Sequence, residues 1–417
     1  MSRVILGDIA ISQTGPFGSQ LHEEDYVSEG TPIVTVEHLG DINFTHQNLP
    51  FVSEADTKRL SKYILIEGDI VFSRVGSIDR NVYVDKNHEG WMFSGRCIRV
   101  RADKNKVNTR YLSYYFKQNS FKKMMMNLAV GATMPSLNTK IMNSIELDLL
   151  PRENQDKIAN ILSAIDDKIQ INNQINQELE AMAKTLYDYW FVQFDFPDQN
   201  GKPYKSSGGK MVYHPELKRE IPEGWGVETL KDFESKIITG KTPSRANSDN
   251  FGGEIPFITI GDIRGNTFIY NTSETLTDLG ASVQQNKYLP EGSLCVSCIA
   301  TVGEIGFTTE WSHTNQQINS IVFEDETNRY YLYFALKNYF ENANASAKTG
   351  NTFANMNKED FSGIRIILPR NEIKNNFHKM TEPYFAQIKC LQGQNKELTQ
   401  LRDWLLPMLM NGQVKVG

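Results

Sequence analysis

The chain is poor in cysteine and contains no long apolar run, and both absences narrow the class of protein. Four cysteines in 417 residues are too few for a disulfide framework, so we expect a reducing, cytoplasmic environment. No apolar stretch approaches the roughly 20 residues that a membrane-spanning helix requires. The first residues, MSRVILGDIAIS, lack the basic start and apolar run of a signal peptide. These features predict a cytoplasmic globular protein, and the length favours two domains.

The chain also lacks an excess of positive charge. Its formal net charge is −6, whereas proteins that bind nucleic acid usually carry a basic surface. The acidity is uneven, because residues 151–195 hold 4 Lys or Arg against 8 Asp or Glu and residues 222–368 hold 11 against 18, while residues 1–150 are balanced. Net charge therefore gives no positive support for DNA binding, but it does not exclude a contact made by one face.

Recognisable catalytic and metal-binding patterns are missing as well. Cys295 and Cys298 have CxxC spacing, but no second cysteine pair or nearby histidine completes a zinc site. The seven histidines are scattered and form no HxxxH pair. The run Asn48–Phe51 is similar to the motif with which amino-methyltransferases hold a target amine, but no Gly-rich loop for S-adenosylmethionine accompanies it. The sequence therefore predicts no catalytic residue, no metal site and no cofactor on this chain.

What the chain does contain is an internal repeat. The segment that ends in LLPR at 149–152 matches the segment that ends in ILPR at 367–370, an offset of 218 residues. Further matched segments follow the same order, for example KYILIEGDIVFSRVG from Lys62 and KYLPEGSLCVSCIATVG from Lys287. Self-similarity at a fixed offset indicates duplicated structural units. We therefore predict two homologous units.

Each unit has the pattern of a globular part followed by a long helix. Short runs of β-branched and aromatic residues, such as TPIVTV and IPFITI, are bounded by turn-forming residues, as is typical of strands. Helical patterns intervene at matching places, 109–125 and 329–343. We predict an α+β fold with two homologous α/β domains. The expected boundaries are residues 1–150 and 222–368 for the domains, 151–195 and 369–417 for the helical segments, and 196–221 for a linker.

The two helical segments carry apolar residues at heptad spacing. Five heptads with mostly apolar a and d positions are typical of a coiled coil, and the register transfers between the helices at the repeat offset. Pro383 is expected to kink or restart the second helix. The alternative is that each helix packs only on its own domain. We predict that the two helices pair with each other through Ile158, Ile161, Ile165, Asn172, Ile175, Leu179, Met182, Leu186, Leu391, Leu398, Leu401 and Leu405.

Four segments resemble a known protein family. They are GPFGSQLHEEDYVSEGTPIV (15–34), LLPRENQDKIANILSAIDDKI (149–169), FDFPDQNGKPYKSSGGKMVYHPELKREIPEGW (194–225) and TGKTPSRANSDNFGGEIPFITIGDI (239–263). The family is the specificity subunit of type I restriction–modification systems, and the likeness covers essentially the whole chain. The resemblance implies two target-recognition domains that each read one half of a split DNA sequence. It also implies that the two helices form an antiparallel, pseudo-twofold coiled coil, which sets the gap between half-sites and docks two methyltransferase subunits. No catalytic chemistry is expected in this chain.

Direct reading of bases requires particular side chains, namely Arg or Lys for guanine and Asn or Gln for adenine, with Ser and Thr more permissive. Loops that combine such residues with glycine occur in both halves. The candidates in the first half are Ser12, Gln13, Thr14, Ser19, Gln20, Ser73, Arg74, Ser77, Arg80 and Asn81. Those in the second half are Lys241, Thr242, Ser244, Arg245, Asn351, Asn355, Asn357 and Lys358. The alternative for each is an ordinary solvated turn, so the matched loops are a stronger prediction than any single side chain.

The function that the sequence predicts is that of a DNA specificity subunit. Its expected partners are double-stranded DNA, two methyltransferase subunits and restriction subunits, and S-adenosylmethionine is expected on the methyltransferase. The alternative is a stand-alone interaction scaffold whose two domains bind protein or glycan. Co-purification distinguishes the two, because only the first requires two methyltransferase copies per chain.

Overall fold

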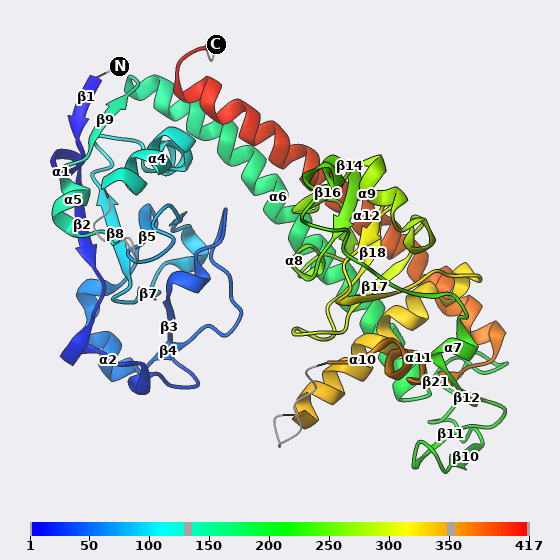
Figure 1. Ribbon diagram of the computed structural model, residues 1–417. Helices are drawn as coiled ribbons and strands as arrows, with labels where there is room; N and C mark the ends of the chain where they lie inside the picture. The colour runs from blue at the N-terminus through cyan, green and yellow to red at the C-terminus, as the bar shows by residue number, and fades with distance from the viewer. Residues whose placement is uncertain (1, 129–135, 348–354, 415–417) are drawn as a thin grey trace. The chain divides into compact units, whose positions relative to one another are not determined.

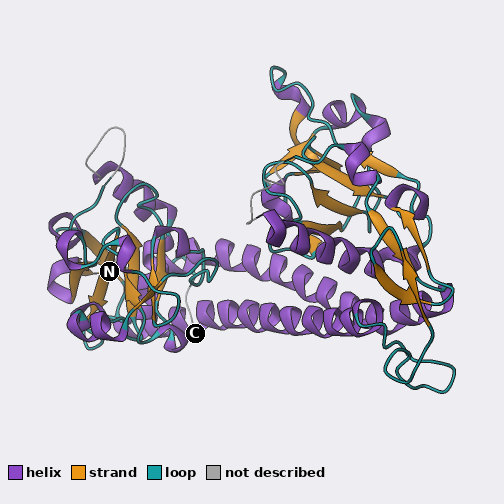
Figure 2. Cartoon of the chain, turned by 90° about the horizontal axis from the view of Figure 1, so that it is seen from below, coloured by secondary structure: helices purple, strands orange, loops and turns teal. Residues whose placement is uncertain are grey.

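The computed structural model describes residues 2–128, 136–347 and 355–414 and divides into two compact units. Unit 1 comprises residues 1–169 and 398–417, and unit 2 comprises residues 170–397. Each unit contains both strands and helices (Figures 1 and 2), as the α+β prediction requires. Two long helices, α6 (Arg152–Tyr187) and α12 (Asn371–Met410), contribute residues to both units. Within the described ranges, no helix is long and apolar enough to cross a membrane.

Unit 1 is built on three sheets. The four-stranded antiparallel sheet has the order β2–β8–β5–β6, with bounds Ala10–Thr14, Cys97–Ala102, Asp69–Ser73 and Asn81–Tyr83. The three-stranded sheet has the order β4–β3–β7, with bounds Phe51–Val52, Thr31–Val34 and Met92–Phe93, and β3 runs parallel to β7. The remaining pair is β1 (Ser2–Ile5) with β9 (Glu146–Leu149). The shorter helices are α1 (Leu6–Ile9), α2 (Glu54–Arg59), α3 (Thr109–Lys117), α4 (Asn119–Leu128) and α5 (Thr139–Asn143).

Unit 2 repeats this strand order. Its larger sheet is β13–β20–β17–β18–β15, with bounds Ile237–Thr239, Ile318–Ile321, Leu294–Ser297, Ile305–Thr308 and Phe268–Ile269. Its three-stranded sheet is β16–β14–β19, with bounds Glu274–Leu276, Phe251–Ile258 and His313–Thr314. The pair β12–β21 has the bounds Gly226–Thr229 and Arg365–Leu368. Two features have no counterpart in the described part of unit 1, namely strand β15 and the hairpin of β10 (Met211–His214) and β11 (Arg219–Pro222).

Short helices complete both units. In unit 2 the α-helices are α7 (Leu230–Phe233), α8 (Ile260–Ile263), α9 (Asp278–Ser282), α10 (Arg329–Ala347) and α11 (Lys358–Ser362). A π-helical turn, η6 (Asp188–Val192), extends α6. The 3-10 helices are Gly18–Gln20, Glu23–Asp25, Val36–His38, Ser61–Tyr63 and Lys86–His88 in unit 1 and Ser248–Asn250, Gln285–Lys287 and Glu326–Asn328 in unit 2.

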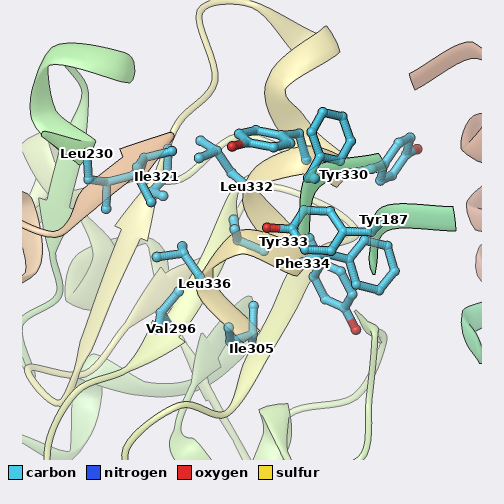
Figure 3. Packing of buried hydrophobic residues seen from close by; sticks show 14 of the residues in the cluster. Tyr187, Leu230, Val296, Ile305, Ile321, Tyr330, Leu332, Tyr333, Phe334 and Leu336 are labelled. Atoms are coloured by element: carbon cyan, nitrogen blue, oxygen red, sulfur yellow. The ribbon is translucent and has the colours of Figure 1, made fainter. Parts of the chain in front are cut away.

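The central strand of each large sheet supplies two apolar cores. Successive side chains of a strand point to opposite faces, so Phe72 of β5 enters the core beside α3 while Val71 enters the core between the two sheets. In unit 2, Val296 of β17 joins the core beside α10 and Cys295 joins the second core. Figure 3 shows Val296 in this first core, with Leu336 of α10. Both faces of the central strand are therefore buried in each unit.

The two long helices pair within each unit, and the direction is antiparallel. In unit 1 the start of α6 joins the same apolar core as the end of α12, with Leu162 and Leu409 fully or almost fully buried. In unit 2 the end of α6 meets the start of α12, where the rings of Tyr187 and Phe377 lie 6.2 Å apart. The predicted antiparallel pairing is confirmed.

The predicted residues of the helix interface are only partly correct. Ile158, Asn172 and Leu391 are buried, whereas Ile161, Met182 and Leu401 are exposed, so the assignment of those three to the interface was wrong. The remaining predicted positions are partly buried: Ile165, Ile175, Leu179, Leu186, Leu398 and Leu405. On α6 the buried side chains lie one residue beyond the predicted d positions: Leu162, Ile169, Asn176 and Ala183. The stripe is displaced because α6 contacts a globular domain as well as α12.

The expected restart of the helix at Pro383 is wrong, because α12 runs without a break from Asn371 to Met410. Proline removes one backbone hydrogen bond and crowds the carbonyl group four residues earlier, which belongs to Lys379. Lys379 and Pro383 both lie on the exposed side of α12. The carbonyl group that loses its partner therefore faces solvent, and the helix continues.

Candidate nucleic-acid interface

Four backbone segments converge at one edge of the sheets in unit 1. We call residues 14–17, 74–75, 94–97 and 136–137 the edge of unit 1. Hydrogen bonds between backbone groups hold the segments together: Gly15 N to Cys97 O at 3.2 Å, Arg74 N to Arg96 O at 2.8 Å, Leu137 N to Arg74 O at 2.9 Å and Ser94 N to Val34 O at 2.9 Å. The two predicted loops of unit 1 thus meet two further segments at a single place that the sequence alone did not define.

Unit 2 contains the same arrangement. We call residues 239–242, 298–299, 314–318 and 355–356 the edge of unit 2. Each bond described above has a counterpart: Gly240 N to Ile318 O at 3.1 Å, Cys298 N to Gln317 O at 2.8 Å, Met356 N to Cys298 O at 2.8 Å and Asn315 N to Ile258 O at 3.1 Å. The repeat that the sequence predicts therefore extends to the individual hydrogen bonds of the two edges.

One glycine at each edge is required by close packing. A Cβ atom on Gly15 would lie 2.2 Å from the carbonyl oxygen of Ser94, and a Cβ atom on Gly240 would lie 2.2 Å from that of Asn315. Both obstacles are backbone atoms, which cannot move aside as a flexible side chain would. Glycine thus allows the first segment of each edge to cross the third.

The predicted contact residues around the loop after β5 are partly buried within unit 1 and partly exposed. Ser73 and Asn81 are buried, and they donate hydrogen bonds to the carbonyl oxygens of Val75 and Phe116, at 2.9 and 3.4 Å. They stabilise the domain and are not exposed for contact with a base. Ser77 and Arg80 are exposed.

Other predicted residues of unit 1 are already engaged by protein groups. The guanidinium group of Arg74 donates hydrogen bonds to the carbonyl oxygens of Leu137 and Gly95, at 3.3 and 3.2 Å, and lies 5.5 Å from the centre of the Phe17 ring. Gln13 accepts a hydrogen bond from Arg99, and Gln20 accepts one from the Tyr63 hydroxyl. Ser12 and Thr14 are half-buried on β2. Ser19 falls in the 3-10 helix Gly18–Gln20, and its side chain lies outside the described part.

In unit 2, the predicted residues differ in the same way. Both guanidinium nitrogens at the end of Arg245 bind the Glu274 carboxylate, at 2.8 and 2.7 Å. Asn357 caps α11 by accepting a hydrogen bond from the backbone of Asp360. Thr242 donates its hydroxyl to Gln316 at 2.6 Å. Lys241, Ser244, Asn355 and Lys358 are exposed, as are Arg245 and Asn357, and Asn351 lies outside the described residues.

Sequence reasoning missed Arg96 and Gln316, which are exposed at the two edges. Each lies in a two-residue turn between a short parallel strand and the next strand of the larger sheet. A sequence signal for these two turns was present, because each turn comes directly before a strand that the repeat matches in the other unit. This signal was weak, because no pattern in the sequence indicates that strands of two different sheets meet there.

Cys295 and Cys298 show no reactive environment. Burial raises the pKa of the Cys295 thiol to about 12 and that of the Cys298 thiol to about 11, so both remain protonated thiols at neutral pH. Cys295 lies within β17, and Cys298 follows its end. No group of three metal-binding side chains occurs among the residues that the structure describes.

Comparison with known proteins identifies the duplicated unit. The family model for the type I restriction modification DNA specificity domain matches residues 2–181 and 222–400. The chain belongs to this specificity family. It is the DNA specificity subunit of a type I restriction–modification system, and specificity subunits are non-catalytic components of these enzymes. Members of the family typically bind no cofactor.

Individual relatives support the assignment. The type I restriction enzyme HindI specificity subunit of Haemophilus influenzae is 32% identical, over 92% of this chain and 95% of that protein. The type I restriction enzyme MjaIX specificity subunit of Methanocaldococcus jannaschii is 26% identical, over 94% of this chain and 89% of that protein. The crystal structure of a type I restriction–modification S subunit from M. genitalium has a TM-score of 0.52 at 14% identity, covering 100% of this chain and 96% of that chain. This structural match shows a shared fold, and the predicted family is confirmed.

Proposed function

We propose that this specificity subunit reads a bipartite DNA target, with one recognition domain for each half-site. The recognition domains are residues 1–150 and 222–368, the helical spacers are residues 151–195 and 369–417, and the linker is residues 196–221. The observation that carries the proposal is the pair of matched edges, since each hydrogen bond of the edge of unit 1 has a counterpart in unit 2. Two equivalent surfaces in one chain suit a target of two separate parts.

The test is to map methylated adenines in DNA exposed to the chain together with its partner methyltransferase. We expect methylation within one two-part sequence, and no such pattern when this chain is left out. Exchanging residues 1–150 for the corresponding domain of a relative should change one half of the target and leave the other unchanged. Methylation without any two-part preference would contradict the proposal.

We further propose that two methyltransferase subunits dock on the paired helices, one in each unit. The support is a set of exposed apolar side chains that the repeat duplicates. Ile161 and Leu401 are 36% and 44% exposed in unit 1, and their repeat counterparts in unit 2, Met380 and Met182, are 49% and 52% exposed. We call these four residues the outer apolar positions. Apolar side chains at d positions that the helix pair leaves uncovered suit further helices from a partner.

Substitution of the outer apolar positions tests this docking. Ile161→Lys with Leu401→Lys should remove one methyltransferase copy from the purified complex, and the same changes at Met182 and Met380 should remove the other. Mass measurement of the intact complex reads the stoichiometry. Val283→Lys is the control, because Val283 is an exposed apolar residue on the globular part of unit 2. Two bound copies in both double variants would contradict the proposed docking positions.

The remaining partners follow from this assignment. S-adenosylmethionine is proposed to bind the methyltransferase, and restriction subunits are proposed to join the complex of specificity and methyltransferase subunits. The net charge of −6 is unfavourable for a protein that alone would neutralise DNA phosphates, and such contacts dominate affinity. We therefore infer that the methyltransferase subunits supply most phosphate contacts. The proposed location is the cytoplasm, which is consistent with four free cysteines.

A further inference from the structure

We propose that one exposed side chain in a matched turn of each unit reads a base: Arg96 reads a guanine in one half-site, and Gln316 reads an adenine in the other. The inference rests on the proposed function, in which each unit reads one half-site. Neither residue belongs to the candidates that the sequence suggested.

The turns have the same backbone structure. In unit 1, the turn Ser94–Cys97 follows β7 and is closed by a hydrogen bond from Cys97 N to Ser94 O at 2.9 Å. In unit 2, the turn Asn315–Ile318 follows β19 and is closed by a bond from Ile318 N to Asn315 O at 3.3 Å. We call these two segments the tip turns. Each joins the parallel strand of the smaller sheet to a strand of the larger sheet.

The tip turns are fixed from three sides. The carbonyl oxygens of Arg96 and Gln317 accept hydrogen bonds from the backbone of the strand ends at Arg74 and Cys298, both at 2.8 Å. The required glycine of each edge packs directly against the first residue of its turn. A turn whose backbone is already held in place loses little conformational entropy on binding. Its exposed side chain is therefore well placed for recognition.

Arg96 differs from the other arginines near it in unit 1. Arg74 binds carbonyl oxygens, Arg99 binds Gln13 and the carbonyl oxygen of Lys62, and Arg101 binds the Asp69 carboxylate at 2.7 Å through each of two nitrogens. Arg96 has no side-chain hydrogen bond or ion pair with the described residues of unit 1. Its planar guanidinium group is available to donate two parallel hydrogen bonds to O6 and N7 of guanine.

Gln316 is held in an orientation that suits adenine. Its Oε1 accepts the hydroxyl hydrogen of Thr242 at 2.6 Å, which fixes the plane of the amide. The second lone pair of Oε1 and the Nε2 group stay available, and these groups match N6 and N7 of adenine. The neighbouring Gln317 is half-buried, and its Oε1 accepts a hydrogen bond from Asn315 at 3.1 Å. Of the two glutamines in the turn, Gln316 is therefore the one that faces solvent and whose Nε2 group is available to donate a hydrogen bond.

The main alternative for Arg96 is a phosphate contact. A phosphate contact carries no direct sequence information, so its loss weakens binding to all sequences about equally. Loss of a base contact instead relaxes one position of the target. Loss of a base contact therefore changes the methylation motif, whereas loss of a phosphate contact changes only the amount of methylation.

The experiment compares methylation motifs of the assembled complex, formed from the full chain and its methyltransferase on a randomised DNA library. For Arg96→Ala we expect discrimination to fall roughly five- to hundredfold at one position of one half-site, with the other half-site unchanged. The position affected should be a guanine in the wild-type motif. For Gln316→Ala we expect the same loss at an adenine of the opposite half-site. Co-purification with the methyltransferase checks that each variant is folded.

Matched control variants are Arg3→Ala and Gln285→Ala. Arg3 is exposed on β1, and Gln285 is exposed in a 3-10 helix outside the edge. Both controls should leave the motif intact. Wild-type motifs in the Arg96 and Gln316 variants would overturn the inference and leave the proposed function standing, as would uniform weakening without a change of motif. A wild-type complex without any bipartite motif would instead overturn the proposed function itself.

Discussion

The internal repeat places a histidine and a methionine at equivalent buried positions. His313 is the strand partner of Phe257 in unit 2, and Met92 is the strand partner of Ile33 in unit 1. His313 is fully buried, and neither ring nitrogen has a hydrogen-bond partner. Burial lowers the pKa of His313 to about 4. The imidazole is therefore neutral at physiological pH and packs as an aromatic ring against Tyr288, with the ring centres 4.6 Å apart.

The buried histidine predicts a loss of stability in acid. The pKa of His313 in the folded chain lies below its ordinary value near 6.5, so the unfolded chain binds the proton more readily. Stability should therefore fall as the pH drops from about 6.5 to 4, with a loss of about 2 kcal/mol at pH 5. His313→Met, which copies the residue of unit 1, should remove this part of the pH dependence. Thermal unfolding from pH 7 to 4.5 measures it, and parallel curves for the two proteins would contradict the prediction.

The kinds of residues at the candidate site could be predicted from the composition of the loops, but the arrangement of those residues in space could not. The loops at 12–20 and 239–248 were recognised because glycine, serine and amide residues cluster there, and each supplies a segment of an edge. The roles of Ser73 and Arg245 were not predictable, because burial and an ion-pair partner 29 residues away depend on how strands are arranged in space. Arg96 was overlooked for the same reason.

At the scale of elements, α6 and α12 are joined in unit 1 by a buried ionic cluster. Asp166 of α6 is almost fully buried and lies 3.1 Å from Arg402 of α12. It also accepts the hydroxyl hydrogen of Tyr114 from α3, at 2.6 Å, and lies 3.7 Å from Arg110. One carboxylate thus connects both long helices to the globular part of unit 1.

Removing this carboxylate should be costly. Asp166→Ala leaves the half-buried cations Arg402 and Arg110 without their shared partner, while Arg402 keeps its bond to Asp403 at 2.8 Å. We therefore expect a cost of roughly 3 kcal/mol, the lower end of the range for breaking a buried ion pair. Asp167→Ala is the matched control, since Asp167 is the exposed neighbour on α6. Urea unfolding of the full chain compares the two variants. Equal midpoints would show that the cluster contributes little.

The heptad pattern predicted that the helices pair but not which positions meet. The a positions Ile158 and Asn172 are buried, and Asn172 donates a hydrogen bond to Asn395 at 2.9 Å. A polar contact of this kind between paired helices fixes their register. The d positions were misplaced, because a heptad template assumes one partner per helix, whereas α6 contacts both α12 and α3. Sequence periodicity alone cannot show which apolar positions contact α12 and which contact α3.

At the scale of the whole molecule, duplication was the most predictable feature, because matched segments can be compared without knowledge of structure. The strand orders of the two units confirm it. The extra strand β15 of unit 2 could not have been inferred from the repeat, since the described part of unit 1 offers no counterpart for comparison. It forms through parallel pairing of Phe268 with Phe307, which are distant in sequence.

The helical spacers predict how the target responds to insertion. Seven residues added to both α6 and α12 keep the heptad phase and lengthen each helix by about 10 Å. We expect the gap between the half-sites to grow by roughly three base pairs, given 3.4 Å per base pair. A seven-residue insertion after Ser207, in the exposed linker, should leave the gap unchanged. The methylation motif of each protein shows the length of the gap. Identical gaps in the wild-type chain, the helix variant and the linker variant would contradict the spacer role.

The division of the chain also constrains the order in which the molecule is completed during synthesis. Unit 2 is one continuous stretch, whereas unit 1 joins residues 1–169 to residues 398–417. Leu409 and Met410 belong to the same buried core as Ile158 and Leu162. Leu409 and Met410 leave the ribosome only after all of unit 2 has been synthesised. Unit 1 therefore begins first and is finished last, and a nascent chain that stops before residue 398 leaves the apolar start of α6 without its contacts to Leu409 and Met410.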